Sequence, residues 1–244
     1  MSSVREPLTG ELTPSEPGIY LARRHAWILQ IIKGGVPAQP VPGDRKPVMD
    51  ALWEIVDAAG GLEFSRMELR RVIGLAQQEF SSLEPIPGPP QVTNWADATT
   101  PAVYYAFYHG VYWTRTVIDR YEELLGPALS HDRALWNSLQ RTRSEAGGSA
   151  FDDARALAGI ALHKWTSPYS GFSAKVEGQK LVYPVVDRIV DRENLRANLR
   201  FSSGRHVEAL IEEYWEAVCR FIDRLLDVFY PSPRVAGRDA SRNV

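Results

Sequence analysis

Histidines and arginines at short spacings are the residues of this chain best suited to acid–base and phosphate chemistry. His163 ends a run of small and apolar residues, and Arg155 precedes it by eight positions. His206 directly follows Arg205 and lies six positions after Arg200. An imidazole can transfer a proton near neutral pH, and a guanidinium can stabilise charge that develops on a phosphate. These residue types could carry acid–base and phosphate chemistry.

A second basic feature recurs with the spacing of a helix. Arginines stand at every fourth position from Arg188 to Arg200, the others being Arg192 and Arg196. On an α-helix this spacing forms a slanting basic stripe that could follow a phosphate backbone. The candidate RNA-binding residues are therefore Arg188, Arg192, Arg196 and Arg205. Acidic residues are interleaved with them (Asp187, Asp191 and Glu193), so the alternative is a solvated, salt-bridged helix face.

An aromatic segment offers a third constellation. Tyr105, His109 and Trp113 are spaced by four residues and share one face of a predicted helix. That face is either the wall of a polar and aromatic pocket or a core face whose polar groups are hydrogen-bonded. On the adjacent face we expect Arg115 and Asp119 to pair. Cys219, the single cysteine, lies among apolar residues of the last helix, which is typical of an inert buried thiol.

Turn and capping signals define the elements that position these residues. Glycine pairs and prolines divide a pattern that is otherwise helical. The predicted helices cover about 19–32, 48 to Gly60-Gly61, an N-cap at Ser65 to about 80, Thr100 to Leu125, 131–144, 150–165, 187–202 and 204–229. Between 168 and 186 the pattern changes to a short β-hairpin around Glu177-Gly178, and we expect strand to be confined to this region. The fold class is therefore all-α, a helical bundle with one short β-hairpin.

The order of these parts resembles the HEPN superfamily of prokaryotic helical bundles. The resemblance covers residues 100–230 and rests on an aromatic helix with YYAFYHGVYW, a helix ending at His163, a hairpin that closes on YPVVDR, and a long terminal helix. Many members of that family are metal-independent ribonucleases that act as dimers in toxin or antiphage systems. Their signature is an arginine, then a polar residue, then a histidine a few positions later. Here Ala158 and Gly159 stand at the first two places of that signature before His163.

The resemblance implies an RNA-binding or RNA-cleaving protein of a bacterial defence or toxin system, with a degenerate signature. The candidate catalytic residues that it implies are His163, Arg155, Arg200 and His206. The alternative is a non-catalytic helical dimerisation or scaffold protein. The implied organisation is a flexible arm (1–18), an N-terminal helical region (19–83), a proline-rich connector (84–99), the HEPN-like bundle (100–230) and a disordered tail (231–244). A small-molecule enzyme that uses the aromatic face is a third possibility.

The composition of the chain limits the kinds of partner and cofactor that we expect. The formal net charge is −2, so any attraction to RNA has to be local. A single cysteine excludes an internal disulfide framework, and no motif predicts a cofactor or a metal. No segment has the length of apolar sequence that a membrane span requires, and a cytoplasmic location is expected. The last helix carries apolar residues on more than one side, including Trp215 beside Tyr214, so we predict a homodimer that buries part of it or of the aromatic helix.

Overall fold

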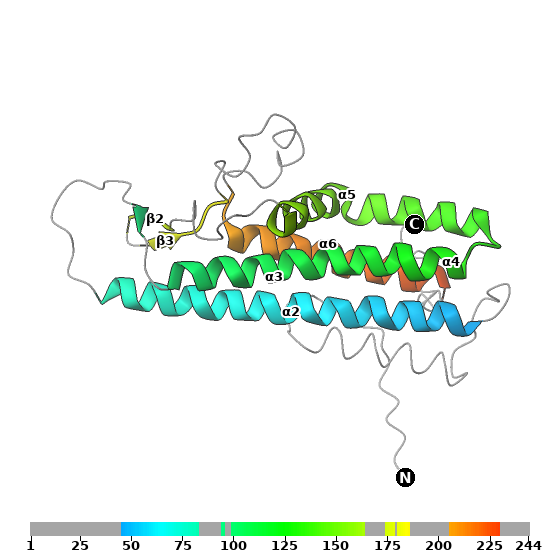
Figure 1. Ribbon diagram of the computed structural model, residues 1–244, viewed down its shortest axis with the longest axis horizontal. Coiled ribbons are helices and arrows are strands. Elements are labelled where there is room, and N and C mark those ends of the chain that lie inside the picture. Colours follow the sequence, from blue (N-terminus) through cyan, green and yellow to red (C-terminus); the bar gives the residue numbers. More distant parts are fainter. Residues whose placement is uncertain are drawn as a thin grey trace, which may run out of the picture.

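In the part of the chain that the structure describes, four long helices form an elongated bundle, with a small sheet at one end (Figure 1). The computed structural model describes residues 45–82, 94–95, 99–163, 174–178, 180–185 and 205–229. The helices are α2 (Arg45–Ser81), α3 (Thr99–Arg120), α5 (Arg133–His163) and α6 (Val207–Phe229). Helix accounts for 87% of the interpretable residues, which confirms the all-α prediction. The predicted helices at 19–32 and 187–202, the arm at 1–18 and the tail at 231–244 lie outside the described residues.

Helix α2 runs without a break through Gly60 and Gly61. The prediction that the glycine pair ends one helix and that Ser65 caps the next is therefore wrong. A Cβ atom on Gly61 would lie 2.2 Å from the ring of Trp113, so this glycine allows α3 to pack closely against α2. The Ser65 hydroxyl donates a hydrogen bond to the Gly61 carbonyl at 2.8 Å, inside the same helix. Residues of the predicted N-terminal region thus belong to the same bundle as α3.

Helix α3 continues through a π-helical turn, η1 (Tyr121–Leu125), into the short helix α4 (Gly126–Ala128). The predicted stop at Gly126-Pro127 is therefore correct to within one turn. The Tyr121 ring stacks on Trp136 of α5, with 5.1 Å between ring centroids. Asp132 then begins α5, because its carboxylate accepts a hydrogen bond from the Leu135 amide at 2.9 Å.

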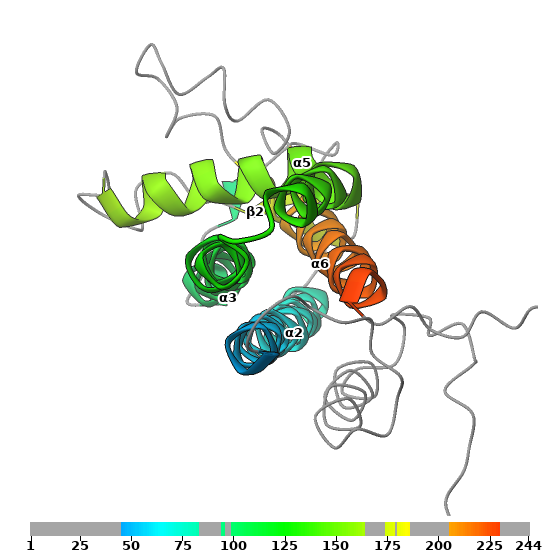
Figure 2. The same ribbon diagram turned by 90° about the vertical axis from the view of Figure 1, so that its right-hand side faces the viewer.

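Helix α5 bends where the sequence predicts two helices divided by Gly147-Gly148. The backbone of Gly147 is non-helical, with φ −177° and ψ 34°. A Cβ atom here would lie 2.6 Å from the Cβ of Ala217, so the glycine brings α5 and α6 into close contact. After the bend, the second half of α5 turns away from the bundle axis and crosses over α3 (Figure 2).

The strands form one antiparallel sheet in the order β1-β2-β3. Strands β2 (Ala174–Glu177) and β3 (Lys180–Val182) form the predicted hairpin, and Gly178 adopts a positive φ of 64° at its turn. Strand β1 (Asn94–Trp95) pairs with β2, so the prediction that strand is confined to the hairpin region is wrong. The Leu181 amide donates to the side chain of Gln77 at 2.9 Å and attaches the sheet to α2.

Helix α6 packs against the three other long helices. It contacts α2, α3 and α5, and Gly110 of α3 makes room for Ile211. Trp215 is only 1% exposed and Tyr214 is fully buried. Trp215 and Tyr214 therefore present no exposed ring to a second subunit, and the predicted homodimer stays a prediction. Cys219, also on α6, is buried as predicted.

Candidate functional site

Arg205 and His206 lie where the chain enters α6, beside the end of the hairpin. The Val185 amide donates to the Arg205 carbonyl at 2.8 Å, and the Val207 amide donates to the Tyr183 carbonyl at 2.9 Å. These two bonds enclose an antiparallel bridge between Pro184 and His206. The chain therefore leaves and re-enters the described structure at one point, on either side of residues 186–204. Arg188, Arg192, Arg196 and Arg200 fall in that interval, outside the described residues.

The Arg205 guanidinium is held by a carboxylate of the same chain. Glu213, two turns further along α6, accepts hydrogen bonds from both terminal nitrogens of Arg205, one of them at 3.0 Å. These bonds raise the pKa of Arg205 more than its partial burial lowers it, and the charges of Glu213 and Asp153 also raise it. The side chains of Arg205 and Glu213 are 34% and 38% exposed. Arg205 is therefore a permanent cation whose charge is largely offset by Glu213.

Behind Arg205 lies a buried cluster of polar side chains. The Tyr214 hydroxyl donates a hydrogen bond to Asp153, and both residues are buried. Burial raises the pKa of Tyr214, and the charge of Asp153 and its hydrogen bond raise it further. Tyr104 donates to the Pro184 carbonyl at 2.9 Å and meets the Tyr183 ring edge-on. Burial also raises the pKa values of Tyr104 and Tyr108. These phenols stay protonated at neutral pH, so they position the chain and do not supply a base.

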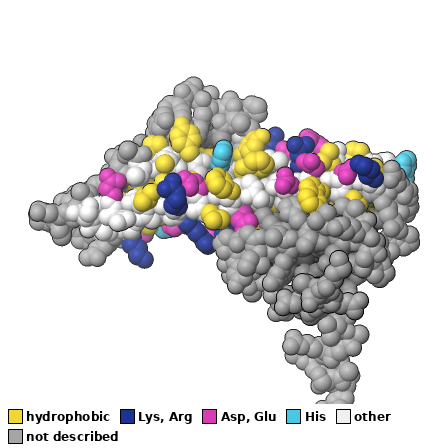
Figure 3. Space-filling model, turned by 90° about the horizontal axis from the view of Figure 1, so that it is seen from below, with side chains coloured by type: hydrophobic (Ala, Val, Ile, Leu, Met, Phe, Trp, Pro, Cys, Tyr) yellow, Lys and Arg dark blue, Asp and Glu magenta, His cyan; other side chains and the backbone are white. Residues whose placement is uncertain are grey.

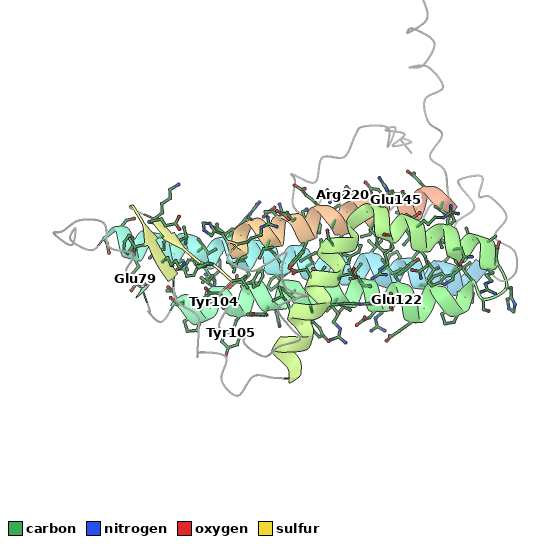
Figure 4. All side chains as sticks on the ribbon, turned by 90° about the horizontal axis from the view of Figure 1, so that it is seen from above. Glu79, Tyr104, Tyr105, Glu122, Glu145 and Arg220 are labelled. Atoms are coloured by element: carbon green, nitrogen blue, oxygen red, sulfur yellow. The ribbon has the colours of Figure 1, made fainter. Side chains whose placement is uncertain are left out.

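His206 is the candidate imidazole whose side chain the structure describes. It is 43% exposed, and its Nε2 atom lies 3.9 Å from the carboxylate of Glu177 at the end of β2. A protonated His206 would therefore face an acidic partner. His163 is the last described residue of α5, and its side chain lies outside the described part. The C-terminal end of α5 projects beyond α3 in Figure 4.

Arg155, the third described candidate, belongs to a different cluster. Its Nη2 atom lies 2.5 Å from Glu122 and 3.5 Å from Asp119. Burial lowers the pKa of Arg155, but the hydrogen bonds and charges of Glu122 and Asp119 outweigh it and raise the pKa overall. The predicted pair of Arg115 and Asp119 is confirmed, with 3.1 Å between its atoms. Figure 4 labels Glu122, which joins η1 to α5 through Arg155.

This ion-pair cluster extends along α5. Arg143 lies 3.6 Å from Glu122 and 3.5 Å from Asp152. Its guanidinium is 18% exposed, whereas Asp152 is 75% exposed. The cluster thus contains arginines and carboxylates in equal measure, namely Arg115, Arg143, Arg155, Asp119, Glu122 and Asp152. Such a balanced arrangement favours a role in joining α3, η1 and α5.

The polar residues that organise Arg205 were missed by sequence reasoning. Asp153 is an acidic residue on the buried face of α5, flanked by Ala150, Ala154 and Leu157. An acidic residue in an apolar stripe is a recognisable signal, because it needs a buried partner. Glu213 also had a signal, since it lies eight positions, about two helical turns, after Arg205.

The aromatic face of α3 is neither a core face nor the wall of a described pocket. Tyr105 is 51% exposed, and His109 is also exposed. The interpretation as a core face is therefore wrong for these residues, while Trp113 packs on Gly61 as described above. A cavity of about 360 Å³ lies elsewhere, between α2 and α6, lined by Leu69, Arg70, Glu208, Ala209, Ile211 and Glu212.

Neither a membrane segment nor a metal centre emerges from the described residues. No helix in these ranges is both long and apolar enough to cross a membrane. Within the same ranges, no three histidine, cysteine, aspartate or glutamate side chains are grouped to hold a metal ion. No protein-family model, no curated protein and no solved structure matches this chain. The HEPN superfamily thus stays a resemblance of sequence pattern.

Proposed function

We propose that this chain is a non-catalytic helical protein whose function is to bind another protein chain as a dimerisation or scaffold module. One observation carries the proposal: the two described arginines among the candidate catalytic and RNA-binding residues are already bound by carboxylates. Arg205 is paired with Glu213, and Arg155 is paired with Glu122 and Asp119. The other candidate arginines, Arg188, Arg192, Arg196 and Arg200, lie outside the described residues.

A carboxylate partner weakens an arginine as a phosphate ligand. Transition-state stabilisation requires donors that are preorganised and directed at the developing negative charge. Here the terminal nitrogens of Arg205 point at Glu213, so a phosphate would first have to displace a carboxylate and then remain near it. The buried phenols behind Arg205 are protonated at neutral pH, which leaves His206 as the described candidate for acid–base chemistry at this end of the bundle.

The runner-up function is RNA binding or cleavage of the HEPN kind. The observation that favours it is the position of His206, which is 43% exposed beside Arg205. This pair flanks the point where residues 186–204, with their four arginines, leave and rejoin the bundle. If those arginines bind RNA, reversal of Arg192 and Arg196 to glutamate should abolish binding.

A cleavage assay separates the two functions. Wild-type protein, His163→Ala and His206→Ala are purified in parallel and incubated with single-stranded and structured RNA at low salt, where phosphate contacts are strongest. We expect the same background cleavage from all three proteins. Cleavage by the wild type that disappears in either histidine variant would instead establish the ribonuclease and overturn the proposed function.

A further inference from the structure

The outer side of α2 and α3 carries a row of exposed rings and apolar side chains. On α2, Phe64 is 66% exposed and Leu75 is 48% exposed; on α3, Tyr105 and Tyr112 are 51% and 46% exposed. His109 is exposed between the two tyrosines. We call these residues the α2–α3 face. Figure 3 shows hydrophobic side chains interleaved with charged ones along the described helices.

Helix geometry places these residues on one side of the helix pair. The contact between Gly61 and Trp113 marks where α2 and α3 meet. On α2, Phe64 and Leu75 are rotated from Gly61 by about 60° and 40° in the direction opposite to buried Leu62. On α3, His109, Tyr105 and Tyr112 are rotated from Trp113 by about 40° to 100° away from buried Thr114. Both sets therefore point away from the core that α2 and α3 share.

We propose that the α2–α3 face is the interface with a second copy of this chain; this inference rests on the proposed function. The three half-exposed rings and Leu75 present on the order of 400 Å² of apolar surface, since a buried aromatic residue removes about 150–250 Å² from water. That value lies within the range of functional patches on monomers. It also approaches the apolar share of the roughly 800 Å² that each partner contributes to a standard interface.

The charges on this face favour a second copy over a polyanion. Glu68 and Arg71 lie between Phe64 and Leu75 in the sequence and form an ion pair at 2.6 Å. The hydrogen bond to Arg71 lowers the pKa of Glu68 despite its slight burial. Nucleic acids and anionic lipid surfaces are bound by an excess of lysine and arginine, whereas this pair has no net charge. A face with no net charge can pack against an identical face across a two-fold axis, because such an interface has to be self-complementary.

The closing experiment has two parts: light scattering measures the mass of the protein in solution, and footprinting then locates the interface. Light scattering of the full chain from about 1 to 100 µM should give twice the monomer mass at the upper end. Phe64→Glu combined with Tyr112→Glu should raise the dissociation constant at least about 100-fold, since each change places an unpaired charge in the interface core. The matched control is Ala134→Glu combined with Asn137→Glu, at two exposed positions of α5, which should leave the wild-type dissociation constant unchanged. Circular dichroism should show the same helix content for all three proteins.

Hydroxyl-radical footprinting then locates the interface. Oxidation of Tyr105 and Tyr112 in the wild type should fall as the concentration rises. A wild type that stays monomeric at 100 µM, or a dimer that survives the double glutamate substitution, would overturn the inference. Either result would leave the proposed function standing, because a different protein partner remains. Histidine-dependent RNA cleavage would overturn the proposed function whether or not the chain dimerises.

Discussion

The removal of one carboxylate from α6 tests the energetics of the bundle most directly. The side chain of Arg66 on α2 is only 4% exposed, and its Nε atom donates to the two carboxylate oxygens of Glu212 at 2.9 and 2.8 Å. The guanidinium also lies over the Trp215 ring, 5.2 Å from its centroid. We predict that Glu212→Ala destabilises the fold strongly, because it leaves a buried cation without a counter-charge.

The magnitude follows from burial. Breaking a buried ion pair costs about 3–5 kcal/mol when one partner is removed. The Glu212 side chain is 31% exposed, so water can reach part of the vacated space, and we expect a loss of about 2–4 kcal/mol. Little of this comes from Arg70, the other cation on Glu212, because Arg70 is 51% exposed and exposed pairs contribute under about 1 kcal/mol. The contact between the Arg66 guanidinium and the Trp215 ring is present both in the wild type and in Glu212→Ala. It contributes about 1 kcal/mol or more to each and does not change the difference in stability.

Urea denaturation monitored by circular dichroism measures the difference. Glu208→Ala, one helical turn earlier on α6, is the matched control and should change stability by less than about 0.5 kcal/mol. Arg66→Met should be nearly neutral, because a buried ion pair can be replaced by apolar groups at little cost once the cation itself is gone. Combined with Glu212→Ala, it should recover most of the lost stability. The reasoning is refuted if Glu212→Ala costs no more than Glu208→Ala, or if Arg66→Met fails to rescue it.

The remaining predictions concern glycines and tyrosines. Gly61→Ala should destabilise the protein by about 1–3 kcal/mol in urea titrations, because the added methyl group would meet the Trp113 ring at 2.2 Å. Gly74→Ala, on the same helix with open space around the new methyl group, should stabilise it by up to about 1 kcal/mol; equal effects of the two changes would contradict the packing argument. Burial raises the pKa values of Tyr104, Tyr108 and Tyr214, so the stability that depends on their protonated forms is complete below about pH 10 and falls as the pH rises above it. Thermal melts between pH 9 and 11 should show this loss, and a flat profile would exclude it. Tyr214→Phe removes the hydroxyl that Asp153 accepts from and should cost about 1–3 kcal/mol at neutral pH; a stability equal to that of the wild type would show that the bond makes no net contribution.

The two glycine pairs within the described residues show how far the sequence could predict this fold. Gly60-Gly61 and Gly147-Gly148 carry the same local signal, yet only the second bends a helix. The difference lies in the residues that pack against them, Trp113 in one case and Ala217 in the other. Those contacts join segments far apart in the sequence, so local patterns could not distinguish them. The hairpin was predictable because its turn signal and both strands are contiguous.

The same division applies to the candidate site. The pair of Arg115 and Asp119 was predictable because four residues on a helix place two side chains side by side. Asp153 and Tyr214 are separated by 61 positions, and their meeting depends on how α5 bends over α6. Exposure of His109 was mispredicted for a related reason, since periodicity identifies a face but does not tell which neighbouring helices cover it.

The paired backbone at Val185 and Arg205 has a consequence for the evolution and engineering of this chain. Two main-chain hydrogen bonds close that junction, so the positions of α6 and the hairpin do not depend on the length of sequence between them. The entropic cost of closing a connection rises only slowly with its length. Residues 186–204 therefore occupy an insertion point, where a segment of different length or composition can be exchanged while the bundle is retained. A variant could join Val185 to Arg205 through a short glycine-containing turn in place of residues 186–204. Comparison of this variant with the wild type would show what the four arginines of that segment contribute, because the helical bundle would be the same in both.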